Sequence, residues 1–216
     1  MRPQPGQKGF LKHNAELRAS NKRTKFFDSR YGHVAVKVMP GEYYVCEEPD
    51  EMIVTVLGSC VAACIRNPIT GVGGMNHFML PEGETPSWGT AGAGLRYGNH
   101  AMEMLINKVL SSGCTREQLE VKVFGGANVN NSGSHSRVGE KNANFVLKYL
   151  ENEGIAIEAA DLGGVTPRRI HYFPTTGNVK RLLLRRASER VVFSDERRYQ
   201  PPKKSEEVAG EIELFD

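Results

Sequence analysis

Short runs of β-branched and aromatic residues, several of them beside paired glycines, constrain the fold of this chain more than any other feature. They lie at residues 33–39, 42–46, 52–57, 119–124, 155–160, 169–173 and 179–184. Runs of this length and composition predict β-strands. Glycine makes up 23 of the 216 residues, and glycine pairs next to such runs indicate strand ends, bulges or close backbone contacts rather than flexible linkers.

Two other segments show the helical spacing of apolar residues. In the first, residues 99–112, Asn99 is expected to cap the start and Gly113 the end. The second covers residues 141–152 and stops at Gly154. Because strands outnumber helices and the order of the two is mixed, the sequence favours an α/β chain of the α+β type with mixed sheets. It disfavours a doubly wound parallel sheet.

Length and charge favour one domain with polar ends. A chain of 216 residues is most simply one domain that buries its own core. Residues 1–33 are polar and lack periodicity, so we expect a basic, flexible N-terminal arm, then a single domain at 34–198 and a polar tail at 199–216. Residues 1–37 hold nine Lys and Arg against two acidic residues, a local balance of +7. With little aromatic interleaving, this favours a solvated arm over a nucleic-acid site.

No apolar run approaches the ~18 residues that a membrane helix needs, and the N-terminus has no signal-peptide pattern. We therefore expect a cytoplasmic protein without membrane insertion, whose thiols stay reduced. Cys60 and Cys64 have no second ligand pair near them, so neither a metal nor another cofactor is expected. Cys46, Cys64 and Cys114 are assigned to packing.

The segment VTVLGSCVAACIRNPITGVGGMNHFML, residues 54–80, is typical of a buried β-hairpin, with a cysteine and a histidine near its open end. A four-residue loop at 67–70 places Cys60 directly opposite His77, with Cβ atoms about 5 Å apart. A slip of one residue would place the two side chains on opposite faces of the sheet.

Two interpretations of this pair stay open from the residues alone. A free cysteine is often a small buried hydrophobe, and the histidine would then be a satisfied core residue. Alternatively, Cys60 is a nucleophile and His77 its base, because the thiolate is the reactive form and a neighbouring imidazolium favours it. The turn at Gly58-Ser59 would then expose the sulfur and leave backbone N–H groups for an oxyanion.

Further segments follow this hairpin in a fixed order: RYGNHAMEMLINKVLSSG, KVFGGANV, VGEKNANFVLKYLENEGIAI, DLGG and RRIHYFPTTGNV. Together with TVLGSCVAACIRNP and VGGMNHFMLP, they resemble the chemoreceptor glutamine deamidase family, CheD. The resemblance is strong from residue 43 to residue 176. It extends loosely to residue 215, at the end of an EIELF segment.

The resemblance implies a layered α/β/β sandwich related to the cytotoxic necrotising factor-type cysteine deamidases. It places the family's nucleophile on Cys60, its base on His77 and its third catalytic member on Thr55. Thr55 either orients His77 or is an ordinary β-branched strand residue. The implied substrates are glutamines in the helical cytoplasmic region of methyl-accepting chemotaxis receptors, and the chemotaxis phosphatase CheC is a further implied partner.

These roles predict amide hydrolysis through a thioester. Cys60, as a thiolate, attacks the glutamine side chain, and His77 protonates the departing ammonia and then activates water. The alternative is a non-catalytic chemotaxis adaptor that binds receptors or CheC. The intact Gly-Ser-Cys segment and His77 favour the enzyme.

Overall fold

Two five-stranded sheets make up most of the chain that the computed structural model describes, which is residues 24–46, 48–80, 93–129 and 138–184. Sheet A has the order β1 (Lys25–Asp28), β2 (His33–Lys37), β4 (Glu51–Leu57), β9 (Arg168–Phe173) and β10 (Asn178–Leu183). Sheet B has the order β3 (Tyr43–Cys46), β6 (Gly73–Asn76), β5 (Val61–Arg66), β7 (Glu120–Gly125) and β8 (Ala159–Leu162). Strands β2 and β4 are parallel, as are β7 and β8, whereas the other neighbours are antiparallel. Both sheets are therefore mixed, as the sequence predicts.

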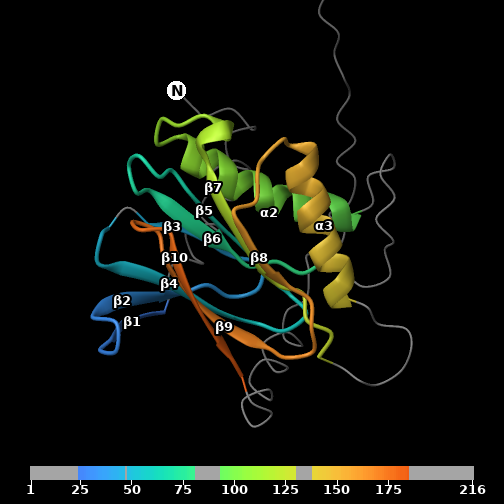
Figure 1. Cartoon of the computed structure of the whole chain (residues 1–216), viewed down its shortest axis with the longest axis horizontal. Helices are drawn as coiled ribbons and strands as arrows, with labels where there is room; N and C mark the ends of the chain where they lie inside the picture. The colour runs from blue at the N-terminus through green and yellow to red at the C-terminus, as the bar shows by residue number, and fades with distance from the viewer. Residues whose placement is uncertain (1–23, 47, 81–92, 130–137, 185–216) are drawn as a thin grey trace, which may run out of the picture.

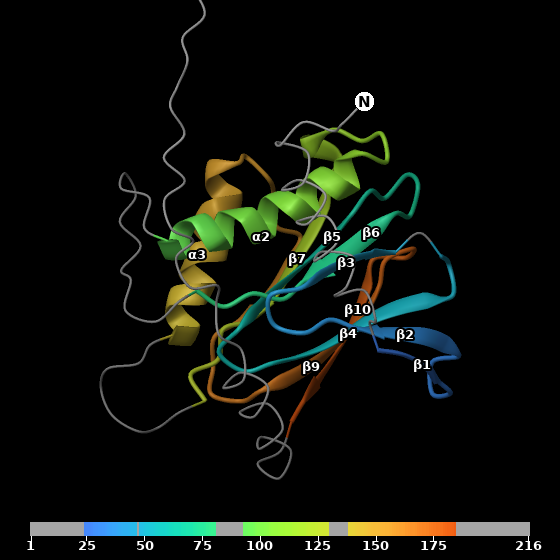
Figure 2. The ribbon, with the colours of Figure 1, turned by 180° about the vertical axis from the view of Figure 1, so that it is seen from behind.

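Helices α2 (Ala93–Leu110) and α3 (Val138–Asn152) cover one face of sheet B, and the short helix η1 (Arg116–Gln118) precedes β7 (Figure 1). Seen from behind, sheet A lies on the side of sheet B that faces away from the helices (Figure 2). No helix in the described ranges has an apolar stretch long enough to cross a bilayer.

Strand β5 shows how the side chains are divided between these layers. Its odd-numbered residues, 61 to 65, join the core beneath the helices, whereas Ala62 and Cys64 join the core between the two sheets. This period-two alternation, with both faces apolar, is what a strand buried on both sides requires. The predicted α/β/β layering is confirmed.

Strand β1 lies inside the segment 1–33, so the expectation of a flexible arm is wrong for Lys25–Asp28. The strand pairs with β2, and Lys25 Nζ lies 2.5 Å from the buried carboxylate of Glu51. The sequence pattern missed β1 because it is an edge strand whose Phe26 and Phe27 stay exposed, so buried and exposed positions do not alternate. Residues 1–23 and the predicted tail at 199–216 lie outside the described residues.

Both predicted helices are present, but α2 begins at Ala93, so Asn99 lies within the helix and does not cap it. Tertiary packing overrides the local capping preference: Gly98, just before Asn99, lies against Phe145 of α3, where a Cβ would come within 2.5 Å of the ring. Gly113 and Gly154 follow the helices with positive φ, as expected at helix ends.

The strand predicted at 155–160 begins only at Ala159, where the chain reaches Lys122 of β7. Upstream, Ile155 packs into the core beneath the helices instead of pairing in the sheet. The sequence pattern therefore predicted a strand in the right part of the chain, but the strand starts only where the chain runs beside β7 and can pair with it.

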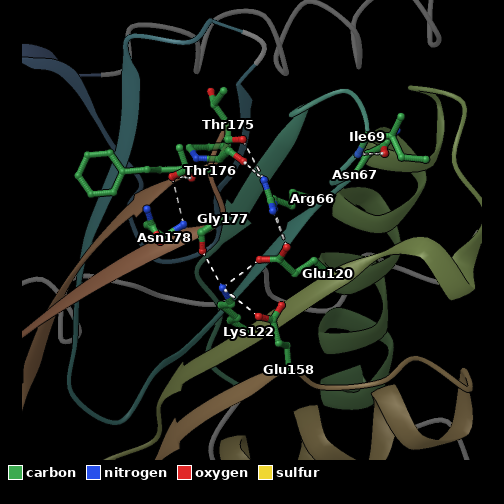
Figure 3. A network of polar contacts seen from close by, with 12 residues as sticks. Arg66, Asn67, Ile69, Glu120, Lys122, Glu158, Thr175, Thr176, Gly177 and Asn178 are labelled. Atoms are coloured by element: carbon green, nitrogen blue, oxygen red, sulfur yellow. Dashed lines mark hydrogen bonds and ion pairs between the residues drawn. The ribbon is translucent and has the colours of Figure 1, made fainter.

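A group of charged side chains joins the two sheets, and we call it the inter-sheet clamp (Figure 3). Arg66 Nη2 lies 2.6 Å from Glu120 Oε2, and Arg66 also donates to the carbonyl of Thr175 at 2.9 Å. Lys122 lies 2.9 Å from the other oxygen of Glu120 and donates to the carbonyl of Gly177 at 2.8 Å. Because Thr175 and Gly177 form the turn between β9 and β10, the clamp ties sheet A to sheet B.

Candidate active site

The hairpin of β5 and β6 pairs two residues away from the predicted register. The observed pairs are Cys64–Met75, Ile65–Gly74 and Arg66–Gly73. Asn67 still donates its N–H to the carbonyl of Val72, so the chain reverses after Asn67 and the predicted loop at 67–70 is wrong. Gly71, with a φ of 76°, provides the left-handed residue that lets the loop close one pair later.

A shift of two residues keeps every side chain on its predicted face. Val61 and Phe78 form a bridge, so Cys60 is a diagonal neighbour of His77 rather than the directly opposite residue. Cys60 packs in the core between the sheets, and the His77 ring reaches Thr55 of β4 across the same layer. Diagonal neighbours lie about 7 Å apart, within reach of long side chains. Contact between the sulfur and the imidazole stays a prediction.

The hydrogen bonds of Thr55 determine which ring nitrogen of neutral His77 carries the proton. Thr55 Oγ1 lies 2.8 Å from the carbonyl oxygen of Val38 and 2.8 Å from His77 Nδ1. A carbonyl can only accept, so the hydroxyl proton goes to Val38 and the hydroxyl oxygen accepts a proton from Nδ1. The neutral ring therefore keeps its proton on Nδ1 and its lone pair on Nε2. Nε2 is buried, with no hydrogen-bond partner in the described part of the chain.

Burial lowers the pKa of His77 from 6.5 to about 4. The carbonyl of Val38 favours the protonated ring and so raises the pKa, but the effect of burial is larger. The imidazole is therefore neutral at pH 7, which is the form that a general base needs. The imidazolium that we expected beside Cys60 is disfavoured by this environment. The site instead favours transfer of the thiol proton to Nε2 during attack.

The turn that carries Cys60 is held by the segment after β7. The N–H of Ala127 donates to the carbonyl of Gly58, and the N–H of Gly126 donates to that of Cys60, both at 2.7 Å. Gly125 has a φ of 111°, and a Cβ there would overlap the Cys60 carbonyl. The glycine pair that ends β7 thus also allows close contact with the Cys60 backbone.

Asn76, next to His77, bonds to the backbone of β5 and to that of α2. Its Oδ1 accepts the N–H of Ala63 at 2.8 Å, and its Nδ2 donates to the carbonyl of Ala101 in α2 at 3.1 Å. The side chain therefore joins the His77 strand to β5 and to the helix layer.

The other three cysteines, all buried and free, have different surroundings. Burial raises the pKa of Cys64 well above its usual range and that of Cys46 to about 12, so both stay protonated at pH 7. Cys114 belongs to the core beneath the helices. Within the described ranges, no group of three His, Cys, Asp or Glu side chains is arranged to hold a metal.

Two residues at this site were not among the sequence candidates. Val38 contributes only its carbonyl, which any residue could supply. Asn142 of α3 bonds to the backbone of Ser59, just before Cys60, and to that of Leu80, three residues after His77. Its partners are distant in sequence, so no spacing indicates them. The one available signal is an amide on the buried face of a helix.

Comparisons with known proteins point to one family. A family model described as "CheD chemotactic sensory transduction" matches residues 79–181. A protein of Rhodopseudomonas palustris (strain BisA53) named "Probable chemoreceptor glutamine deamidase CheD" is 53% identical over 191 residues, covering 88% of this chain and 89% of the relative. Proteins with the same name from Methylobacillus flagellatus and Bordetella petrii are 47% and 58% identical, over 88% and 71% of this chain and 94% and 68% of their own. Among solved structures, the Bacillus licheniformis hypothetical protein YfiH matches 57% of this chain and 49% of its own. Its TM-score of 0.34 and identity of 12% are too low to support an argument.

Proposed function

This chain belongs to the chemoreceptor glutamine deamidase family, CheD, and on that premise we propose that it converts glutamine side chains of chemoreceptors to glutamate. The observation that carries the proposal is the hydrogen bond from His77 to Thr55, which leaves Nε2 of a buried, neutral imidazole able to accept a proton in the layer that holds Cys60. A thiol nucleophile needs such a base, because at its ordinary pKa it is mostly protonated at pH 7.

In the first half of the reaction, the Cys60 sulfur bonds to the carbonyl carbon of the glutamine side chain while its proton passes to His77 Nε2. The carbonyl oxygen becomes an oxyanion in the tetrahedral intermediate. The C–N bond then breaks, and Nε2 returns the proton to the leaving nitrogen. Ammonia departs and a thioester remains on Cys60.

In the second half, water attacks the thioester and gives one proton to Nε2. The C–S bond breaks, the sulfur takes that proton back, and glutamate is released. One water is consumed and one ammonia is formed, so atoms and charges balance. Thr55 holds the Nδ1 proton throughout, and Nε2 stays the atom that exchanges protons.

Mass spectrometry of a purified receptor fragment tests the reaction, because each deamidation adds about one dalton as nitrogen leaves and oxygen enters. We expect wild-type protein to produce this shift. Cys60→Ala and His77→Ala should each reduce it to background, and the double variant should lose no more than either single one, because the pair acts as a unit.

Cys64→Ala is the matched control, since Cys64 lies in the same core between the sheets and its loss leaves a similar cavity. It should retain activity. Full activity in folded Cys60→Ala protein would end the nucleophile role. A wild-type protein that binds the receptor fragment but never changes its mass, with or without CheC, would support the adaptor instead.

The family resemblance carries the proposal to the place of action and to a second partner. We infer that the substrate glutamines lie in the helical cytoplasmic region of methyl-accepting chemotaxis receptors, so the protein works in the cytoplasm. CheC is the proposed regulatory partner. Calorimetric titration of folded Cys60→Ala protein with each candidate tests both, because this variant binds without turning over.

A further inference from the structure

Asn142 of α3 has no part in the chemistry proposed above, yet its side chain is fully buried, at 0% exposure. A buried amide is tolerated when its donors and acceptors are paired, because an unpaired one loses its hydration without replacement. Both ends of this amide are used. Nδ2 donates to the carbonyl of Ser59 at 2.8 Å, and Oδ1 accepts the N–H of Leu80 at 2.9 Å.

The two backbone groups that Asn142 joins flank the proposed nucleophile and base. Ser59 comes directly before Cys60, and Leu80 follows His77 by three residues. One segment precedes β5 and the other follows β6, so both lie at the open end of the β5–β6 hairpin. A single planar amide on a helix therefore sets the separation of the turn and the strand end.

Close backbone contact brings α3 to this position. A Cβ at Gly139 would lie 2.5 Å from the carbonyl oxygens of Gly126 and Ala127, so a larger residue would push the helix away. Gly139, Asn142 and Ala143 lie on one face of the helix, at the i, i+3 and i+4 positions that face the same neighbour. This face presses the segment after β7 against the Cys60 turn.

The result is that three consecutive carbonyls of the turn are held: Gly58 by the N–H of Ala127, Ser59 by Nδ2 of Asn142, and Cys60 by the N–H of Gly126. Of the three, only the bond to Ser59 comes from a side chain. The Ser59–Cys60 peptide is planar and trans, so fixing its carbonyl toward α3 also turns the N–H of Cys60 away from α3.

We propose that Asn142 is a positioning residue for deamidation, which holds the Cys60 turn at a set distance from the strand that carries His77. The inference rests on the proposed roles of Cys60 and His77. Without the amide, all reacting groups remain, but the sulfur and Nε2 lose their alignment. A displacement of about 1 Å between reacting groups costs on the order of 100-fold in rate.

Asn142→Asp tests this with the smallest change. The aspartate keeps the shape and can still accept from Leu80, but it sets an oxygen against the carbonyl of Ser59. We expect kcat to fall about 10–100-fold, as for other residues that orient a catalytic group. KM for the receptor fragment should change little, because Asn142 is fully buried and has no surface with which to touch a bound receptor.

Asn67→Asp is the matched control. Asn67 is also buried, and its amide also makes two hydrogen bonds. Nδ2 donates to Ser112 Oγ at 3.0 Å, and Oδ1 accepts the N–H of Ile69 at 3.0 Å. It lies at the closed end of the hairpin, beyond Arg66. This variant should lose stability like Asn142→Asp but keep its kcat. An equal loss of kcat in both variants would show that Asn142→Asp acts only by destabilising the fold in general, and this would overturn the proposal.

The rate of alkylation by iodoacetamide at pH 7 separates a positioning role from a merely structural one, because the two roles change the rate for Cys60 in opposite directions. A misaligned base slows labelling of Cys60 and leaves Cys64 and Cys114 unchanged. General loosening instead speeds labelling of all buried thiols. Wild-type kcat together with a wild-type rate of Cys60 alkylation in folded Asn142→Asp protein would overturn the proposal.

The wild-type protein decides the matter if the variants do not fold. Alkylating Cys60 should shift the side-chain amide resonances of Asn142 and leave those of Asn67 in place. Unchanged Asn142 resonances would count against the proposal. Should the wild type show no deamidation, the proposed function fails, whereas the alkylation and resonance measurements still test whether Asn142 positions Cys60.

Discussion

At the scale of the residue, the Thr55 hydroxyl matters because it makes two hydrogen bonds of opposite sense. Thr55→Val keeps the shape of the side chain but leaves the Nδ1 proton of His77 without its acceptor. The ring can then rotate or change tautomer. We expect kcat to fall about 10–100-fold, with little change in KM for the receptor fragment.

Thr55→Ser is the companion variant, because serine keeps the hydroxyl and loses only a methyl group. It should restore most of the activity that Thr55→Val loses. Equal activity in Thr55→Val and wild type would make Thr55 an ordinary β-branched strand residue, the second of the interpretations that the sequence left open.

Sequence reasoning found the residues whose chemistry is rare and missed those whose chemistry is common. Cys60 and His77 stand out because few side chains titrate or attack near neutral pH. Val38 and Asn142 act through hydrogen bonds to partners that only the fold brings close. The pKa of His77 could not be predicted either, because burial dominates it and burial is a property of the packed sheets.

At the scale of the element, alternation predicted which face each side chain takes but not which residue it pairs with. The β5–β6 hairpin shifted by two residues, because the Asn67 loop closes one pair later than turn preferences suggested. Side-chain faces survive such a shift, since they repeat every two residues. Edge strand β1 shows the opposite limit, because without alternation it gave no signal at all.

The inter-sheet clamp leads to a prediction about how the two sheets are held together. Burial raises the pKa of Glu120, but hydrogen bonds from Arg66 and Lys122 outweigh it and lower the pKa. The Arg66 and Glu120 side chains are 13% and 16% exposed. Arg66→Met leaves the carboxylate with one cation in a partly dry site and should lower the free energy of unfolding by about 2 kcal/mol.

Arg116→Met is the control for the clamp, because Arg116 pairs with Glu153 at the surface, where the side chains are 42% and 35% exposed. Its cost should stay below about 1 kcal/mol. Urea unfolding of both variants measures the difference. Equal losses would show that the clamp is no stronger than a surface ion pair.

At the scale of the whole molecule, β1 limits how much of the N-terminus can be removed. Deleting residues 1–23 should leave unfolding and deamidation nearly unchanged. Deleting residues 1–28 removes β1 and takes Lys25 from the buried carboxylate of Glu51. We expect a loss of about 2 kcal/mol, or roughly 4–8 °C in Tm. Activity should fall as well, because β2 leads directly to Val38, the acceptor for Thr55.

Lys25→Met in the full-length chain separates the ion pair from the strand. It should reproduce part of the stability loss but little of the loss of activity. A wild-type Tm in the protein that lacks residues 1–28 would mean that β1 contributes nothing to the stability of sheet A. Loss of activity on deleting residues 1–23 alone would assign a function to the arm.

The last prediction concerns the pH dependence of folding stability, which follows from the burial of His77. Its pKa is about 4 when folded and about 6.5 when unfolded, so the unfolded chain binds an extra proton between these values. Stability is therefore complete above pH 6.5 and falls as the pH drops toward 4, by on the order of 3 kcal/mol. His171, whose pKa burial also lowers, adds a loss in the same direction.

His77→Asn removes the titrating group, so its urea midpoint should change less between pH 7 and pH 5 than that of the wild type. His171→Asn serves as the comparison, because His171 pairs with Val54 and therefore lies on the face of sheet A opposite to Thr55, where its ring centroid is 5.0 Å from that of Tyr31. It should remove only its own part of the slope. If His77→Asn kept the full wild-type slope, His77 would not be held neutral by the fold, and the general-base step drawn from its neutrality would lose its support.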